Sequence, residues 1–231
     1  MKEIYIGNIR LRDKVICVIP LTDDDVFTMD CPIGADMIEL RIDMFNDVSI
    51  NKIIETFNQA RIKFNLPIIA TIRSIKEGGT GSLTDGQRID IYSAIIDLTD
   101  AVDIEINSSI VKEIIALSKK HKKTSIASFH DFKQTPNLTF LEEIHNKGRE
   151  NSCDIIKIAV TPNNFNDLRT ITEFTLKYWD KGIVTIAMGQ LGRSSRLYLP
   201  LIGSLFTFAT VKTTSAPGQL SLKEMRQFFP D

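Results

Sequence analysis

Cysteine and histidine are scarce in this chain, and neither is arranged as a metal site would require. The 231 residues include three cysteines, Cys17, Cys31 and Cys153, and three histidines. An odd number of cysteines cannot all pair, and there is no CxxC spacing, so the sequence favours a reducing compartment over a disulfide framework. We expect no metal site, because the histidines are scattered and the cysteines form no ligand pair.

The chain also lacks an excess of charge of one sign and a long apolar run. Lys and Arg number 28 against 29 Asp and Glu, which leaves no basic surface typical of nucleic-acid or membrane binding. The most apolar stretch, 197–211, contains Pro200 and Gly203 and is shorter than the roughly 20 residues of a membrane span. Residues 1–10 have no secretory signal pattern. We therefore expect a soluble, cytoplasmic protein that binds neither nucleic acid nor membrane.

Short runs rich in β-branched residues alternate with helical patterns along the chain. Apolar residues at 50, 53, 54 and 57 have the spacing of a helix with one buried face. We expect strands at 15–20, 37–43, 67–74, 101–106, 124–130, 155–160, 183–188 and 205–211. We expect helices at 50–64, 85–98, 109–121, 138–150, 166–179 and, despite Pro200, at 194–202. This alternation predicts βαβ units and a parallel sheet.

Eight such units predict an α/β fold of the (β/α)8 TIM-barrel class, with one domain over 1–231. Ahead of the barrel at 14–231, residues 3–6 and 9–11 flank Gly7 and Asn8, which predicts a short N-terminal β-hairpin within 1–13. This hairpin could cover the N-terminal mouth of the barrel. A doubly wound open sheet is the alternative fold. In a barrel, functional groups lie at the C-terminal ends of strands and in the loops that follow.

Lys157 is the most unusual residue in the predicted strands. It lies among five apolar residues at 155–160, and burial disfavours the charge of a lysine. The strand could lie at a sheet edge, with the ammonium reaching solvent. Alternatively, Lys157 attacks a carbonyl and forms an imine that serves as an electron sink. Ile155, Lys157 and Ala159 share one strand face, which favours the second interpretation.

His130 ends the preceding strand, where an imidazole can act as an acid or base. We expect the other two histidines, His121 and His145, at the surface because they fall on helical patterns.

Charged residues gather at the ends of the second, third and fourth strands: Glu39, Arg41, Asp43, Arg73, Glu77, Asp103 and Glu105. For any one of them a structural ion pair is the simpler explanation, but their concentration predicts a polar pocket. The loops after the last two strands, at 188–196 and 215–219, add glycines suited to anion binding. Arg196 can hold a carboxylate with two hydrogen bonds, and Ser215 and Gln219 can bind oxygen atoms. The segment 215–219 is also our candidate for a lid.

Together these segments resemble the type I 3-dehydroquinate dehydratases (3-dehydroquinases) of the shikimate pathway. The resemblance runs from Lys14 to Gln219 and is most specific at 39–41, 128–132, 157–160, 188–196 and 215–219. It implies a (β/α)8 barrel, usually a homodimer, that converts 3-dehydroquinate to 3-dehydroshikimate and water without a metal or organic cofactor.

The resemblance also implies residue roles. Lys157 matches the lysine that forms the imine with the ring ketone, and His130 matches the histidine that removes the C2 proton and assists departure of the C1 hydroxyl. Glu77 and Asp103 match carboxylates near that histidine. A neutral Lys157 is needed for attack, so burial and a cationic neighbour should depress its pKa. The positions that match substrate-binding residues, with Arg196 as the carboxylate clamp, are Glu39, Arg41, Arg73, Met188, Arg196, Ser215 and Gln219.

The first strand departs from the family pattern, because it is apolar where some members have a serine.

Two other functions compete with the dehydratase. A class I aldolase would also use a lysine on the sixth strand, but it would not need the segments at 128–132 and 215–219. A catalytically inactive barrel kept as a ligand sensor or assembly module would be free to lose Lys157 or His130, and both are present.

Overall fold

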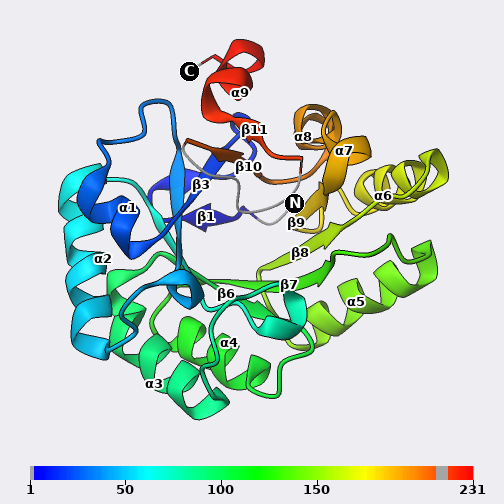
Figure 1. The fold of residues 1–231 in the computed structure, drawn as a ribbon. Helices are drawn as coiled ribbons and strands as arrows, with labels where there is room; N and C mark the ends of the chain where they lie inside the picture. Colours follow the sequence, from blue (N-terminus) through cyan, green and yellow to red (C-terminus); the bar gives the residue numbers. More distant parts are fainter. Residues whose placement is uncertain (1–2, 212–217, 231) are drawn as a thin grey trace.

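The barrel strands follow one another around the molecule in the order of the sequence. The computed structural model describes residues 3–211 and 218–230 (Figure 1). Its parallel sheet contains β3 (Cys17–Leu21), β4 (Met37–Arg41), β5 (Ile68–Thr71), β6 (Ala101–Glu105), β7 (Thr124–Asp131), β8 (Ile155–Val160), β9 (Ile183–Ala187) and β10 (Thr207–Thr210).

The ends of this sheet meet, which gives it the form of a barrel. β10 pairs in parallel with β3, and Leu205 N donates to Ile183 O at 2.9 Å where β9 and β10 approach each other. A doubly wound sheet would reverse its strand order at a switch point, so this order excludes the alternative fold. The expected TIM-barrel class is confirmed.

The helices form a ring outside the strands (Figure 1). They are α2 (Ile50–Phe64), α3 (Asp85–Ile95), α4 (Val111–Lys120), α5 (Leu138–Glu150) and α6 (Phe165–Lys177). These five lie close to the expected ranges, although the range 85–98 ends in a separate 3₁₀ turn, η3 (Ile96–Leu98). Two further 3₁₀ turns, η1 (Ile42–Met44) and η2 (Ile75–Glu77), follow β4 and β5.

The helix expected at 194–202 is broken into short pieces. α7 (Gly189–Gly192) and α8 (Ser195–Tyr198) precede a 3₁₀ turn, η4 (Pro200–Ile202). Pro200 stands at the start of that turn, where its missing N–H costs no hydrogen bond.

The sequence ranges did not include two short helices, α1 (Asp23–Thr28) and α9 (Leu222–Phe228), or the short strand β11 (Leu220–Ser221) beside β10. Both helices begin with a capping box, Thr22 with Asp25 and Ser221 with Glu224. That pattern is visible in the sequence. Helices of six and seven residues are, however, too short to show a clear 3.6-residue repeat.

The N-terminal hairpin forms as expected and closes one end of the barrel. β1 (Tyr5–Ile6) and β2 (Ile9–Arg10) pair antiparallel across Gly7, whose φ of +59° favours glycine. The buried side chains of Ile4, Ile6 and Leu11 pack with the inward-facing residues of the barrel strands. In Figure 1 the hairpin lies within the ring of helices.

Alternating side chains divide the core between the inside of the barrel and the layer under the helices. On β4, Met37 belongs to the inner cluster, whereas Ile38 and Leu40 belong to the outer one. Glu39 and Arg41 therefore share the inner face with Met37. On β8 the same parity places Lys157 inside, between Ile155 and Ala159. The charged faces of these strands thus point into the barrel.

His145 contradicts the expectation of a surface residue. It is 5% exposed, and its ring centroid lies 4.1 Å from that of Tyr178, between α5 and α6. Desolvation lowers its pKa to about 4, because a charged imidazole would lose water there. The imidazole serves as a core ring on the buried face of α5, which helical periodicity alone could not distinguish from a polar position. His121 is partly exposed and contacts Asp97.

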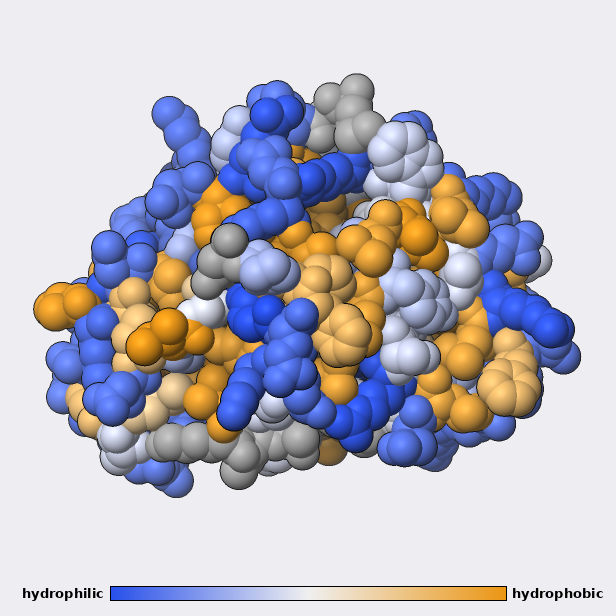
Figure 2. Space-filling model, turned by 90° about the horizontal axis from the view of Figure 1, so that it is seen from above, coloured by the Kyte–Doolittle hydropathy of each residue, from blue (hydrophilic) through white to orange (hydrophobic). Residues whose placement is uncertain are grey.

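On the face shown in Figure 2, hydrophobic side chains form separate patches among hydrophilic ones. Among the described residues, no helix has both the length and the apolar character needed to cross a bilayer.

Candidate active site

Lys157 lies inside the barrel on a central strand. β8 pairs with β7 and with β9, and Lys157 is 4% exposed, so the edge-strand interpretation is wrong. Its Nζ atom is 3.0 Å from Asp103 Oδ2, 3.5 Å from Glu39 Oε1 and 4.5 Å from the ring centre of Phe208. In the part of the chain described, the direct charged contacts of Nζ are thus carboxylates and not the cation that we expected.

Asp103 connects Lys157 to a second buried cation. Its Oδ1 atom accepts from Arg73 Nη2 at 2.7 Å and from the Ser128 hydroxyl at 2.6 Å. Desolvation would raise the pKa of Asp103, but the charges of Arg73 and Lys157 outweigh it and hold that pKa well below its usual value. Asp103 therefore stays ionised. Its hydrogen bonds within the described chain go to these groups and not to His130.

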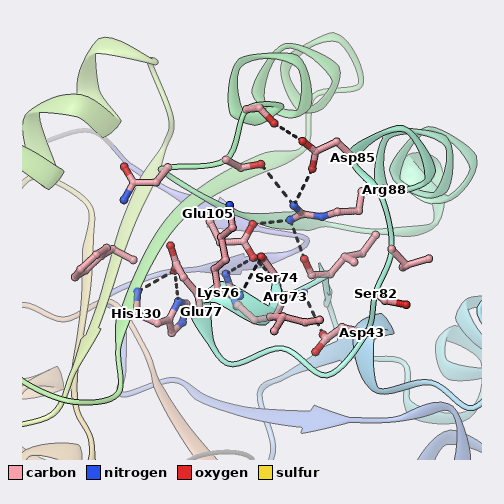
Figure 3. A pocket seen from close by; sticks show the side chains of 18 of the residues that line it. Asp43, Arg73, Ser74, Lys76, Glu77, Ser82, Asp85, Arg88, Glu105 and His130 are labelled. Atoms are coloured by element: carbon pink, nitrogen blue, oxygen red, sulfur yellow. Dashed lines mark hydrogen bonds and ion pairs between the residues drawn. The ribbon is translucent and has the colours of Figure 1, made fainter.

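The ion-pair network continues from Arg73 to Glu105 and then to Arg88, which lies near the start of α3. Arg73 Nη1 lies 3.3 Å from Glu105 Oε1, and Arg88 Nη2 donates to Glu105 Oε2 at 2.5 Å (Figure 3). Glu105 also accepts from the backbone N–H of Ser74 at 2.7 Å, the residue that caps η2. The network therefore fixes the segment that carries Glu77.

His130 and Glu77 form a close pair at the edge of the site. Glu77 Oε2 lies 3.0 Å from His130 Nδ1 and accepts from the His130 backbone N–H at 2.9 Å. If Nδ1 carries the proton, it donates to Glu77 and Nε2 keeps its lone pair. Desolvation, together with the charges of Arg73 and Lys157, lowers the pKa of His130 well below its usual value, so the ring is a neutral base near pH 7.

Arg41 and Arg196 differ sharply in how their charges are balanced. Arg41 binds Asp43 through two hydrogen bonds, at 2.9 and 2.8 Å. Arg196 is 2% exposed, and its Nε and Nη2 atoms are buried without a hydrogen-bond partner within residues 3–211 and 218–230. Desolvation lowers the pKa of Arg196 to about 10. A buried guanidinium without an anion is costly.

One cavity brings together most of the predicted residues. It is lined by Lys157, His130, Glu77, Glu39, Arg41, Arg73, Met188, Arg196 and Gln219. Asp103 lies directly behind Lys157. Ser215 lies outside the described residues, as does most of the candidate lid at 215–219. Of that segment, Gly218 packs on Gly189, and a Cβ added to it would lie 2.2 Å from Gly189 O.

The sequence did not single out three residues of this site. Phe208 lies under Lys157 Nζ, Phe132 stacks beside His130 with ring centroids 6.4 Å apart, and Arg88 ends the ion-pair network. Phe208 follows the inward parity of β10, which could have identified it. Phe132 lies beyond the end of β7, where strand parity no longer applies.

The fold and the buried amine next to a neutral imidazole define a barrel enzyme, and comparison with known proteins gives its family. The model of the type I 3-dehydroquinase family matches residues 20–230. A 3-dehydroquinate dehydratase of Thermodesulfovibrio yellowstonii is 41% identical over 219 residues, covering 95% of this chain and 92% of the relative. One from Salmonella typhimurium is 36% identical over 201 residues, covering 83% and 80%.

Solved structures agree with the sequence relatives. The type I 3-dehydroquinate dehydratase of Clostridium difficile, with covalently modified comenic acid, has a TM-score of 0.89 at 27% identity and covers 98% of this chain and 96% of its own. The enzyme of Aquifex aeolicus has a TM-score of 0.83 at 30% identity, covering 93% and 97%. The chain belongs to the type I 3-dehydroquinase family, which confirms the expected family and hydro-lyase class.

The burial of Glu77 generates a pH prediction. Desolvation raises its pKa from 4.5 to about 7, so the folded protein binds a proton that the unfolded chain has already lost between these values. The contribution of Glu77 to the free energy of unfolding should therefore fall as pH rises from 4.5 to 7, by about 3 kcal/mol in total. Glu77→Gln, which keeps an acceptor for His130, should not show this fall.

The measurement is the free energy of unfolding in urea for wild type and Glu77→Gln from pH 5 to pH 8. The two proteins should differ little at the acidic end, and the variant should be the more stable above pH 7. Parallel curves at all pH values would mean that Glu77 is not the group that titrates.

Proposed function

We propose that this protein dehydrates 3-dehydroquinate to 3-dehydroshikimate through an imine on Lys157, with His130 as the acid–base group. The observation that carries the proposal is a single cavity lined by a buried amine, a neutral imidazole and a guanidinium with two nitrogen atoms that no described residue pairs. Family membership supports the same reaction. The proposed chemistry uses no metal and no organic cofactor.

The proposed reaction begins when the amine of Lys157 attacks the ring ketone and one water leaves as the C=N bond forms. The imine makes the adjacent C–H acidic. His130 takes the C2 proton, and the electrons of the broken C–H bond enter an enamine. The enamine expels the C1 hydroxyl, which leaves as water with the proton from His130. A second water hydrolyses the product imine and restores the amine. Overall, one water is released for each ketone converted.

Arg196 is proposed as the clamp for the substrate carboxylate. Two parallel hydrogen bonds to a carboxylate would satisfy the guanidinium atoms that have no partner in the described part of the chain. Arg41, Arg73, Glu39, Met188, Gln219 and Ser215 are proposed to bind the rest of the substrate. Glu77 is proposed to hold the His130 ring, and Asp103 to hold Lys157 and Arg73.

The first test follows the ultraviolet absorbance of the conjugated enone formed from 3-dehydroquinate, with no metal added. Wild type should form product, whereas Lys157→Ala should lose activity by at least about 10⁴-fold because no imine can form. His130→Ala should lose a factor of about 10² to 10⁴, because only proton transfer is removed. Lys157→Ala within tenfold of wild type would contradict the imine mechanism.

Arg196→Met tests the clamp through two opposite effects. KM should rise about thirtyfold, equivalent to about 2 kcal/mol for a lost charged hydrogen bond, with a smaller change in kcat. The melting temperature without substrate should rise, because an unpaired buried charge is removed. An unchanged KM would remove Arg196 from substrate binding, and a lower melting temperature would mean that its charge is compensated.

We also propose a cytoplasmic homodimer in which each subunit is a single barrel domain. Besides the family resemblance, one surface favours a second copy of this chain as the partner. Leu176 and Trp179 at the end of α6 are 54% and 49% exposed, and Leu201 in η4 is 66% exposed. Trp179 packs against Gly203 at the end of η4, so these apolar groups are neighbours. Apolar patches of this kind are typical of protein interfaces.

Light scattering should give twice the chain mass of 26.1 kDa at micromolar concentration. Leu201→Glu should weaken dimerisation by about tenfold or more, because it places a charge in the apolar contact. Ile62→Glu is the matched control, since Ile62 is 80% exposed on α2. A monomeric wild type would contradict the dimer, and equal effects of the two variants would place its interface elsewhere.

A further inference from the structure

A second and larger cavity lies directly behind His130. It has a volume of about 1020 Å³ and extends from Glu77 and Phe132 to Ser108, Ser109 and Asp85. Asp85 is the first residue of α3 (Figure 3). Its walls are rich in polar and charged groups, so it holds water. Four residues line this cavity and the cavity of Lys157 alike: Arg73, Glu77, His130 and Phe132.

Phe132 is the apolar member of this shared wall. Its ring is nearly parallel to the His130 ring, with an angle of 16° between the planes. The ring edge at Cε2 and Cζ lies against Gly78, which ends η2 with a φ of +84°. A Cβ added to Gly78 would lie 2.4 Å from Phe132 Cε2 and 2.6 Å from Cζ. A larger residue at 78 would therefore displace the ring.

A wall that keeps water from the substrate imine would favour the proposed reaction. The substrate imine can lose its C2 proton and go forward, or it can be attacked by water and return to ketone and free amine. Hydrolysis at that stage adds one water across the C=N bond and wastes the cycle. Excluding water from a reactive intermediate is a general function of active-site walls. His130 itself lines the large cavity, so water in that cavity lies next to the base.

We propose that Phe132, seated on Gly78, is a positioning residue that separates the water of the large cavity from the imine on Lys157. This inference rests on the proposed function, because it concerns the fate of the imine. On this proposal Phe132 raises the fraction of the substrate imine that loses its C2 proton instead of being hydrolysed. Glu77 and His130 form the polar part of the wall between the two cavities, and Phe132 forms its apolar part.

The test measures how the imine divides between hydrolysis and elimination. When the substrate imine is hydrolysed, the ketone recovers its oxygen from solvent, so 3-dehydroquinate in ¹⁸O-labelled water gains one label for each wasted cycle. Mass spectrometry of the unreacted substrate at low conversion gives labels per product formed. Spontaneous ketone exchange is subtracted with Lys157→Ala, which forms no imine.

Phe132→Ala should raise the labelling rate per enzyme and also the number of labels per product, the latter roughly fivefold or more, because water reaches the imine sooner than the proton is removed. Phe132→Leu, which still covers Gly78, should stay closer to wild type. Phe228→Ala is the matched control, since Phe228 lies on α9 and is 61% exposed. Its ratio should equal that of wild type.

An unchanged ratio in Phe132→Ala would overturn the proposal, whether or not kcat falls. If the labelling rate per enzyme stays at the wild-type value while kcat falls, the ratio rises only because a displaced His130 removes the proton more slowly, and that result would also overturn the proposal. If wild type formed neither product nor label, the proposed function itself would fail. That outcome is distinct from a failure of the role proposed for Phe132.

Discussion

The ion pair between Lys157 and Asp103 is the interaction on which the rest of the site depends. A lysine on a central barrel strand can be buried only if its charge is compensated, and Asp103 lies 3.0 Å from its Nζ atom. Asp103 in turn binds Arg73, and Arg73 approaches Glu105. Removing any one member would take a counter-charge from each of its buried neighbours and unbalance the network. The inner faces of β6 and β8, and the start of the loop after β5, are therefore fixed relative to one another.

This balanced network contrasts with the one cation beside it that has no anion among the described residues. Arg196 is almost fully buried, yet two of its nitrogen atoms lack a hydrogen-bond partner. The protein stores an unfavourable desolvation energy at this position, which an anionic ligand can release. In the proposed reaction the same ligand brings its ketone to Lys157. Local instability and affinity for substrate thus have one physical origin.

Much of this could be predicted from the sequence, because periodicity and parity are local properties. The period of two on β4 and β8 placed Glu39 and Lys157 on faces that the barrel turns inward. The partners of Asp103 could not be predicted, since they depend on side-chain reach across neighbouring strands. His145 was misjudged for a related reason: a helical pattern gives a position around the helix axis, but not the depth of the layer that covers it. Phe132 lies past the end of its strand, where no period applies.

The most direct test of the account is to reduce the protein with borohydride in the presence of 3-dehydroquinate and map the modified peptide. Imine formation at the buried amine predicts one covalent adduct per chain, on Lys157, with none in Lys157→Ala. Because exposed lysines lack the surrounding clamp for the substrate, they should remain unmodified. An adduct on another lysine, or none while product forms, would contradict the central claim.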